Sequence, residues 1–208
     1  MIFILKIILV QINFYLLFLK VVRGCWVNPF VKKDPITPDI LQRIIAVFGD
    51  RNGVSKLRIC VLFLLGFSGF LRYSELSNIK MNNSELQDTH VKITIEKSKT
   101  DMYRRGSSVI IAKTDNDLCP VFWLKRYIEL NDLEYNSDEY ICRSLPFFKS
   151  KGVHKLCTRN VPLSYTRARA ILLSSLDRVG LDKSRFGLHS FGPLSIVIIC
   201  VQSNCYNI

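Results

Sequence analysis

Apolar side chains recur at helical spacing in the first half of the chain. One helix is predicted to begin at Thr37-Pro38, where Thr37 suits the N-cap and Pro38 the first helical position. The residues expected on its buried face are Ile40, Leu41, Ile44, Ile45 and Phe48. The stretch 56–65 is apolar almost throughout, which predicts a helix that is buried on all sides.

Two more helices are predicted in the second half. Residues 120–130 form an amphipathic pattern, with Val121, Leu124, Tyr127 and Ile128 pointing inward. Ser164 is expected to cap a long helix that ends at Gly180 and buries Ala168, Ile171, Leu172 and Val179. Three arginines of this helix are expected on its solvated polar side, namely Arg167, Arg169 and Arg178.

Between the helices of the first half and those of the second half, apolar and polar residues alternate with a period of two. Val91, Ile93 and Ile95 alternate with polar residues, which predicts a half-buried strand, and residues 107–112 form a second strand candidate. Short strands are also expected around residues 140–143. The predicted fold class is therefore α+β and mainly helical, with a small antiparallel sheet.

A turn after the buried helix presents an arginine. Gly66 and Gly69 are expected to loosen that helix, Arg72 follows at once, and Glu75 opens a new helical turn. An arginine held on a buried scaffold suits bidentate recognition of a phosphate. An ordinary surface arginine after a helix break is the alternative.

A basic hairpin tip, residues 97–106, is predicted to join the two strands. It carries Lys97, Lys99, Arg104 and Arg105. A hairpin of this kind can insert a lysine into a groove, and Lys99 is well placed to do so. The alternative is a solvated turn, in which lysine is common.

Both ends of the chain differ from the middle. Residues 1–22 form a hydrophobic segment, which is read either as a signal anchor or, as we favour, as a non-native start, since its apolar core is short for a membrane span. Residues 23–36 are read as a basic linker, and residues 192–208 as an apolar tail.

The composition favours an anionic partner. The 208 residues include 29 basic and 17 acidic side chains, a formal net charge of +12, which suits nucleic acid or an acidic membrane surface. The seven cysteines contain no C-x-x-C pair, and His154 with Cys157 lacks further ligands for zinc. We therefore expect no metal, no cofactor and a reducing compartment.

Four short stretches carry a resemblance to a known family. They are Lys33-Asp34-Pro35-Ile36-Thr37-Pro38, Gly69-Phe70-Leu71-Arg72-Tyr73-Ser74-Glu75-Leu76, Ser98-Lys99-Thr100-Asp101 and Arg185-Phe186-Gly187-Leu188-His189-Ser190-Phe191. Through them the chain resembles the catalytic domain of tyrosine recombinases (phage integrases), most closely those of eukaryotic mobile elements of the DIRS and crypton kind. The resemblance spans roughly residues 32–191 and implies an incomplete recombinase-like catalytic domain at 37–191.

The resemblance implies the chemistry of DNA strand exchange, in which a tyrosine hydroxyl attacks a DNA phosphate. Two arginines stabilise the phosphoryl oxygens, a hairpin lysine protonates the leaving 5′-oxygen, and a histidine assists. Matched by motif, these roles fall to Arg72, to Lys99 with Lys97 as the fallback, and to His189. The residues expected to contact DNA are Arg72, Lys97, Lys99, Arg104 and Arg105.

The sequence also departs from the family. Gly192 stands three residues after His189, where the family has its second arginine, and Pro193 follows. Tyr206 is the sole tyrosine beyond His189, at shorter spacing than the family's, so the nucleophile is unknown. The chain thus resembles a truncated recombinase whose last segment departs from the family after Phe191.

The expected function is therefore binding of double-stranded DNA, related to DNA integration and recombination, without cleavage and in the nucleus or cytosol. Homo-oligomerisation on DNA, and membrane contact through residues 1–22, are further options. One alternative is an active strand-exchange enzyme that uses Tyr206 or a partner's tyrosine. The other is a membrane-anchored, non-enzymatic interaction protein.

Overall fold

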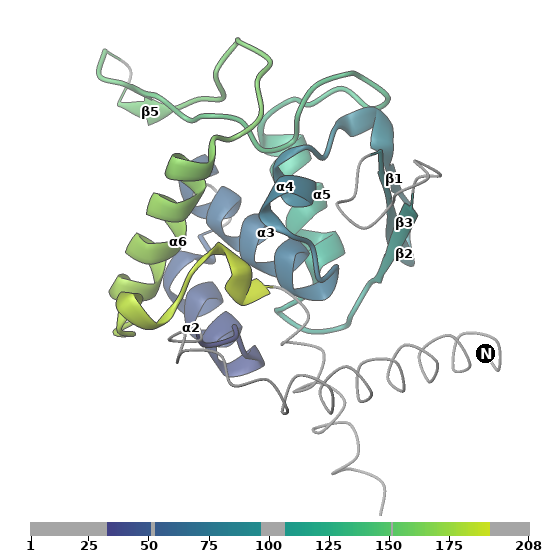
Figure 1. Cartoon of the computed structure of the whole chain (residues 1–208). Coiled ribbons are helices and arrows are strands. Elements are labelled where there is room, and N and C mark those ends of the chain that lie inside the picture. The colour runs from purple at the N-terminus through teal and green to yellow at the C-terminus, as the bar shows by residue number, and fades with distance from the viewer. Residues whose placement is uncertain (1–32, 51–52, 97–106, 151, 192–208) are drawn as a thin grey trace, which may run out of the picture. The chain divides into compact units, whose positions relative to one another are not determined.

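The helix α3 (Val54–Ser68) is the element on which the other helices pack (Figure 1). The computed structural model describes residues 33–50, 53–96, 107–150 and 152–191. From Leu57 to Phe67, every residue of α3 except the half-buried Ile59 is buried, as the apolar run predicts. One buried residue, Arg58, is charged. The helix continues through Gly66 instead of loosening there, because its C-cap is Gly69.

Four further helices surround α3: α2 (Pro38–Phe48), α4 (Tyr73–Ser77), α5 (Pro120–Leu130) and α6 (Tyr165–Arg178). Thr37 caps α2 as predicted, with its hydroxyl oxygen accepting a hydrogen bond from the Ile40 amide at 3.4 Å. Ser164 caps α6 in the same way through the amide of Arg167. The predicted inward residue Tyr127 of α5 is fully buried.

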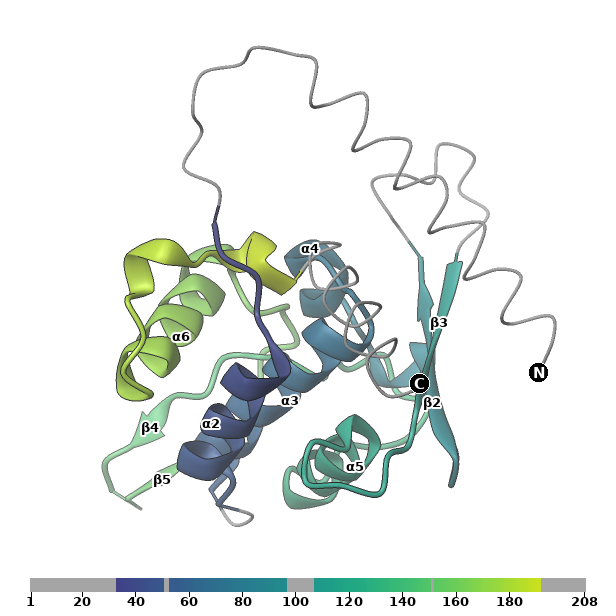
Figure 2. The ribbon, with the colours of Figure 1, turned by 90° about the horizontal axis from the view of Figure 1, so that it is seen from below.

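A three-stranded antiparallel sheet lies on one side of α3 and α5, and α6 lies on the other (Figures 1 and 2). Its strands are β1 (Ser84–Leu86), β2 (His90–Ile95) and β3 (Ser107–Ala112), in that order. Ile93 of β2 pairs with Val109 of β3, and the alternating apolar residues of β2 are buried as predicted. The sequence analysis missed β1, which is only three residues long.

The strands expected around residues 140–143 are absent. Tyr140 forms only an isolated bridge with Lys80, and Ile141, Cys142 and Arg143 are all buried. A small hairpin of β4 (Phe147–Phe148) and β5 (Val153–His154) follows instead. Three short 3-10 helices complete the described part: η1 (Met81–Asn83), η2 (Lys183–Arg185) and η3 (Leu188–Phe191).

Several predictions fall on other parts of the chain. The hydrophobic segment 1–22, the hairpin tip 97–106 and the tail 192–208 lie outside the described residues. Within the described ranges, no helix is long and apolar enough to cross a membrane.

Candidate nucleic-acid interface

A tight turn between α3 and α4 presents Arg72. Phe70 adopts the left-handed conformation, with φ of 49°, which a residue with a side chain rarely takes. The amide of Leu71 donates to the carbonyl of Gly66 at 3.1 Å. A Cβ atom on Gly69 would lie 2.9 Å from Leu71 Cγ and 3.0 Å from the Leu65 carbonyl oxygen, so the turn requires glycine there.

Glu75 holds the backbone and the side chain of Arg72. One carboxylate oxygen accepts a hydrogen bond from the Arg72 amide at 2.9 Å, and the other lies 3.6 Å from the guanidinium nitrogen Nη1. Only 8% of the Glu75 side chain is exposed, against 39% for Arg72. A guanidinium has five donors in a rigid fork, so the exposed part of Arg72 can still bind an anion.

Tyr73, the neighbour of Arg72, ties α4 to the entrance of α6. Its hydroxyl donates a hydrogen bond to the Leu163 carbonyl oxygen at 2.5 Å, and its ring meets that of Tyr165 edge-on at 5.3 Å. Burial raises the pKa of Tyr73 above its ordinary value, which keeps the hydroxyl protonated and able to donate. The Arg72 backbone is therefore fixed by contacts on both of its sides.

The helix η3, which carries His189, docks against the same end of α3. The ring of Phe191 packs edge-on against Phe63, with 5.3 Å between centroids. A Cβ atom on Gly66 would lie 3.1 Å from the Phe191 ring, so glycine permits this approach. Leu188 of η3 and Tyr73 of α4 also line one small apolar cavity. The segments of Arg72 and His189 thus lie side by side, with His189 exposed (Figure 2).

The segment Lys33–Ile36 pairs with the region of His189 and is packed into the domain, although it was predicted as part of a linker. The amide of Asp34 donates to the Arg185 carbonyl at 2.7 Å, and that of Ile36 to the Ser190 carbonyl at 3.0 Å. Arg185 and Asp34 also form an ion pair at 2.6 Å. Two of the stretches that carry the family resemblance are therefore adjacent in space.

The sheet approaches the Arg72 turn from the other side. Ile111 of β3 would lie 3.1 Å from a Cβ atom on Gly69. Ser74 and Glu75 of α4 line one groove together with Thr94, Ile95 and Glu96, where β2 ends. The predicted DNA-contacting residues of the tip, Lys97, Lys99, Arg104 and Arg105, lie outside the described residues, but the end of β2 that leads into the tip adjoins α4.

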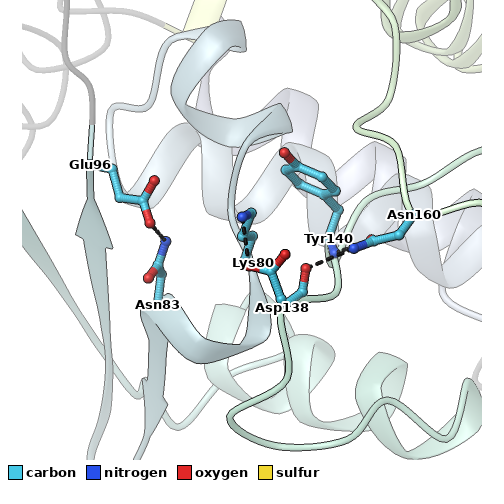
Figure 3. A network of polar contacts seen from close by, with 6 residues as sticks. All are labelled: Lys80, Asn83, Glu96, Asp138, Tyr140 and Asn160. Carbon is cyan, nitrogen blue, oxygen red and sulfur yellow. Dashed lines mark hydrogen bonds and ion pairs between the residues drawn. The ribbon is translucent and has the colours of Figure 1, made fainter.

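A polar network supports this groove (Figure 3). Lys80 donates to Asp138 at 2.6 Å, and its ammonium group lies 5.3 Å from the centre of the Tyr140 ring. The hydrogen bond to Asp138 raises the pKa of Lys80 above its ordinary value. Asn160 links the Asp138 carbonyl to the Tyr140 amide, while Asn83 donates to Glu96. The pair of Lys80 and Asp138 holds the start of η1 against the segment after α5, and the bond from Asn83 holds η1 against the end of β2.

Two residues that hold the Arg72 turn in place were not identified from the sequence. Glu75 was interpreted only as the start of a helix, although its position three residues after Arg72 is a detectable signal for an ion pair. Tyr73 gave no signal, because its partner Leu163 lies 90 residues away.

Comparisons with known proteins agree with this architecture. The chain is 28% identical over 160 residues to an integrase/recombinase XerD homolog of Selenomonas ruminantium, which covers 76% of this chain and 43% of that protein. The crystal structure of XerA recombinase matches with a TM-score of 0.55 at 14% identity, covering 89% of this chain and 54% of that one. XerH site-specific recombinase bound to its difH substrate matches with a TM-score of 0.54 at 14% identity, covering 83% and 44%.

No family model matches the sequence. The chain spans less than half the length of the curated relative and about half that of the XerA structure. In sequence the chain is similar to the tyrosine recombinase (integrase) family, and its fold is that of the catalytic domain of these enzymes.

Proposed function

We propose that this chain binds double-stranded DNA as a tyrosine-recombinase-like domain related to site-specific DNA recombination. The observation that carries the proposal is the junction of three recombinase-like stretches around one end of α3. Arg72 is fixed there by Glu75, the segment of His189 docks beside it, and Lys33–Ile36 pairs with that segment. The DNA complex of XerH, a structural neighbour, supports the choice of partner.

In this proposal Arg72 and His189 face a backbone phosphate. The exposed part of the Arg72 guanidinium takes the phosphoryl oxygens, while Glu75 holds its orientation. His189, exposed on η3, supplies a second donor, and Lys99 approaches from the hairpin tip, with Lys97 as its substitute. Arg104 and Arg105 add phosphate contacts along the duplex.

We further infer that the chain binds DNA without cleaving it. Gly192 provides no guanidinium at the position where the resemblance implies the second arginine. Phosphoryl transfer relies on fixed positive groups around the developing charge, so the loss of one of two arginines removes a large part of the transition-state stabilisation.

The amino-acid sequences of the four motifs also lead us to propose descent from a eukaryotic DIRS- or crypton-type element, and hence a nuclear location.

Duplex binding at several salt concentrations tests the proposal. The logarithm of the affinity should fall linearly with the logarithm of the salt concentration, because each neutralised phosphate releases a counterion. Arg72→Ala should weaken binding by about tenfold or less and make the slope shallower by about one, since other phosphate contacts remain.

Lys56→Ala is the matched control for this experiment. Lys56 is an exposed cation in the first turn of α3, paired with Asp50, and the Arg72 turn follows the opposite end of that helix. Its removal should leave both the affinity and the slope unchanged. Equal losses in the two variants would show that only net charge matters, and a wild-type chain without salt-dependent duplex binding would contradict the proposal.

A further inference from the structure

A groove between the first half of α3 and one face of α6 contains three arginines. Arg58 of α3 lies in it together with Arg167 and Arg178 of α6. Its volume is about 340 Å³, within the range of sites for small ligands. None of the described residues that line this groove is acidic, and three serines add hydroxyl groups, namely Ser55, Ser174 and Ser175. We call it the arginine groove.

Arg58 is a buried charge with no acidic partner among the residues that the structure describes. Only 4% of its surface is exposed, and Nη1 donates to the carbonyl of Arg143 at 3.0 Å. Its Nε has no acceptor within the described part of the chain, and no ion pair to Arg58 is found there. Buried charges in proteins are normally paired, so this arrangement is unusual and calls for an anion.

Arg167 adds a second positive charge near Arg58. Burial is the main cause that lowers the pKa of Arg58; Tyr127 and Cys142 act in the opposite direction, and the positive charge of Arg167 lowers the pKa. The hydroxyl group of Ser175, on the same groove, is also buried without a partner among the described residues. Two residues with a buried unpartnered polar atom, Arg58 and Ser175, therefore line one groove together with two further arginines, and no described residue that lines it is negatively charged.

Arg167 and Arg178 lie on the same face of α6, toward different ends of the helix. Arg167 and Arg178 are eleven residues apart, which places their backbones about 16 Å apart along the helix axis. The guanidinium of Arg178 lies 5.6 Å from the centre of the Phe48 ring, at its own end of the groove. Arg58 and Arg167 therefore define one anionic position, and Arg178 defines a second.

We propose that the arginine groove binds an anion with two phosphoryl groups, one held by Arg58 and Arg167 and the other by Arg178. The groove is separate from the Arg72 turn, because Arg58 precedes the end of α3 by ten residues, about 15 Å along the axis. The inference therefore does not depend on the proposed DNA interface. The two phosphoryl groups come from a soluble diphosphate or from neighbouring phosphates of a nucleic-acid backbone.

Calorimetric titration of the full chain with inorganic pyrophosphate and inorganic phosphate tests this site, with chloride used to match ionic strength. Pyrophosphate should bind saturably with one site per chain and at least tenfold more tightly than phosphate. Arg167→Gln and Arg178→Gln should each weaken pyrophosphate binding at least tenfold. Both side chains are exposed, so these variants should fold.

Arg169→Gln is the matched control. Arg169 is exposed on the same helix but does not line the groove, since it lies about 200° around the helix from Arg167. This variant should bind pyrophosphate like the wild-type chain. An equal loss in all three variants, no saturable binding, or equal affinities for phosphate and pyrophosphate would each overturn the proposal.

A competition experiment identifies the source of the phosphoryl groups. If saturating duplex DNA displaces pyrophosphate from the wild-type chain, and Arg167→Gln also weakens duplex binding, the groove takes backbone phosphates. If duplex and pyrophosphate bind together, the ligand is a soluble diphosphate. Both outcomes support a diphosphoryl site. Whether the site exists is decided by the calorimetric titration with pyrophosphate.

Discussion

At the scale of single residues, the candidate interface depends on side chains that position Arg72. Its ion pair with Glu75 is local, so the Arg-x-x-Glu spacing could have predicted it. The hydrogen bond from Tyr73 to Leu163 spans 90 residues and has no counterpart in the sequence pattern. The burial of Arg58 was not predicted either. It lies within an apolar run, and periodicity cannot show that a charge there is buried with no acidic partner among the described residues.

The buried thiols of Cys60 and Cys142 lead to a prediction about alkaline stability. Burial raises the pKa of each from 9.0 to about 12. Between these values the unfolded chain has lost both thiol protons while the folded chain keeps them. The free energy of unfolding should therefore fall as pH rises above 9, by about 1.4 kcal/mol per pH unit for each thiol.

Urea unfolding at pH 8, 9 and 10 measures this slope. The variant Cys60→Ala/Cys142→Ala is less stable at pH 8 because it leaves small cavities, but its stability should change less with pH. Cys157→Ala is the control, because Cys157 is only half-buried. A double variant with the wild-type slope would show that the two thiols do not titrate differently on folding.

At the scale of elements, the helices and strands whose apolar residues recur with a clear period were predicted from the sequence. The bounds of β3 and α5 agree residue for residue with the expected ranges 107–112 and 120–130. The prediction of strands at 140–143 failed because three successive buried residues show no alternation. The backbone there pairs with distant segments, since the Ile141 amide donates to the Ile79 carbonyl and the Cys142 carbonyl accepts from Leu163.

The contact between α3 and η3 gives a prediction at this scale. Gly66→Val should destabilise the fold by about 1–3 kcal/mol, because its Cβ would press on the Phe191 ring at 3.1 Å. The same variant should weaken duplex binding, since η3 carries His189. Gly187→Val is the control. Gly187 lies just before η3, and the nearest atom to a new Cβ there is Lys33 Cγ at 3.7 Å. Equal destabilisation in both variants would show that the close approach of Phe191 is unimportant.

At the scale of the whole molecule, the stretches that carry the family resemblance are joined by long-range contacts. Lys33–Ile36 pairs with residues about 150 positions later, and the Arg72 turn lies against both η3 and the sheet. No local pattern predicts such pairings. The resemblance predicted them indirectly, because stretches that form one site in a family are expected to meet in any chain with that fold.

The last prediction concerns covalent chemistry. The purified chain should form no protein–DNA adduct on a library of nicked duplexes with randomised sequence, which removes the need to know the target. Gly192 cannot hold the scissile phosphate, and the loss of one such donor alone costs a factor of about 10²–10³ in rate.

Two variants separate the causes of the expected inactivity. Tyr206 lies seventeen residues after His189 (206 minus 189), which is shorter than the spacing implied by the family resemblance. Gly192→Arg restores the missing guanidinium but not that spacing, so it should still yield no adduct. An adduct from the unmodified chain that Tyr206→Phe abolishes would contradict the proposal and identify Tyr206 as the nucleophile. An adduct that appears only with Gly192→Arg would instead show that the second arginine is the single missing part, because the phosphate would then have both clamps and a tyrosine within reach.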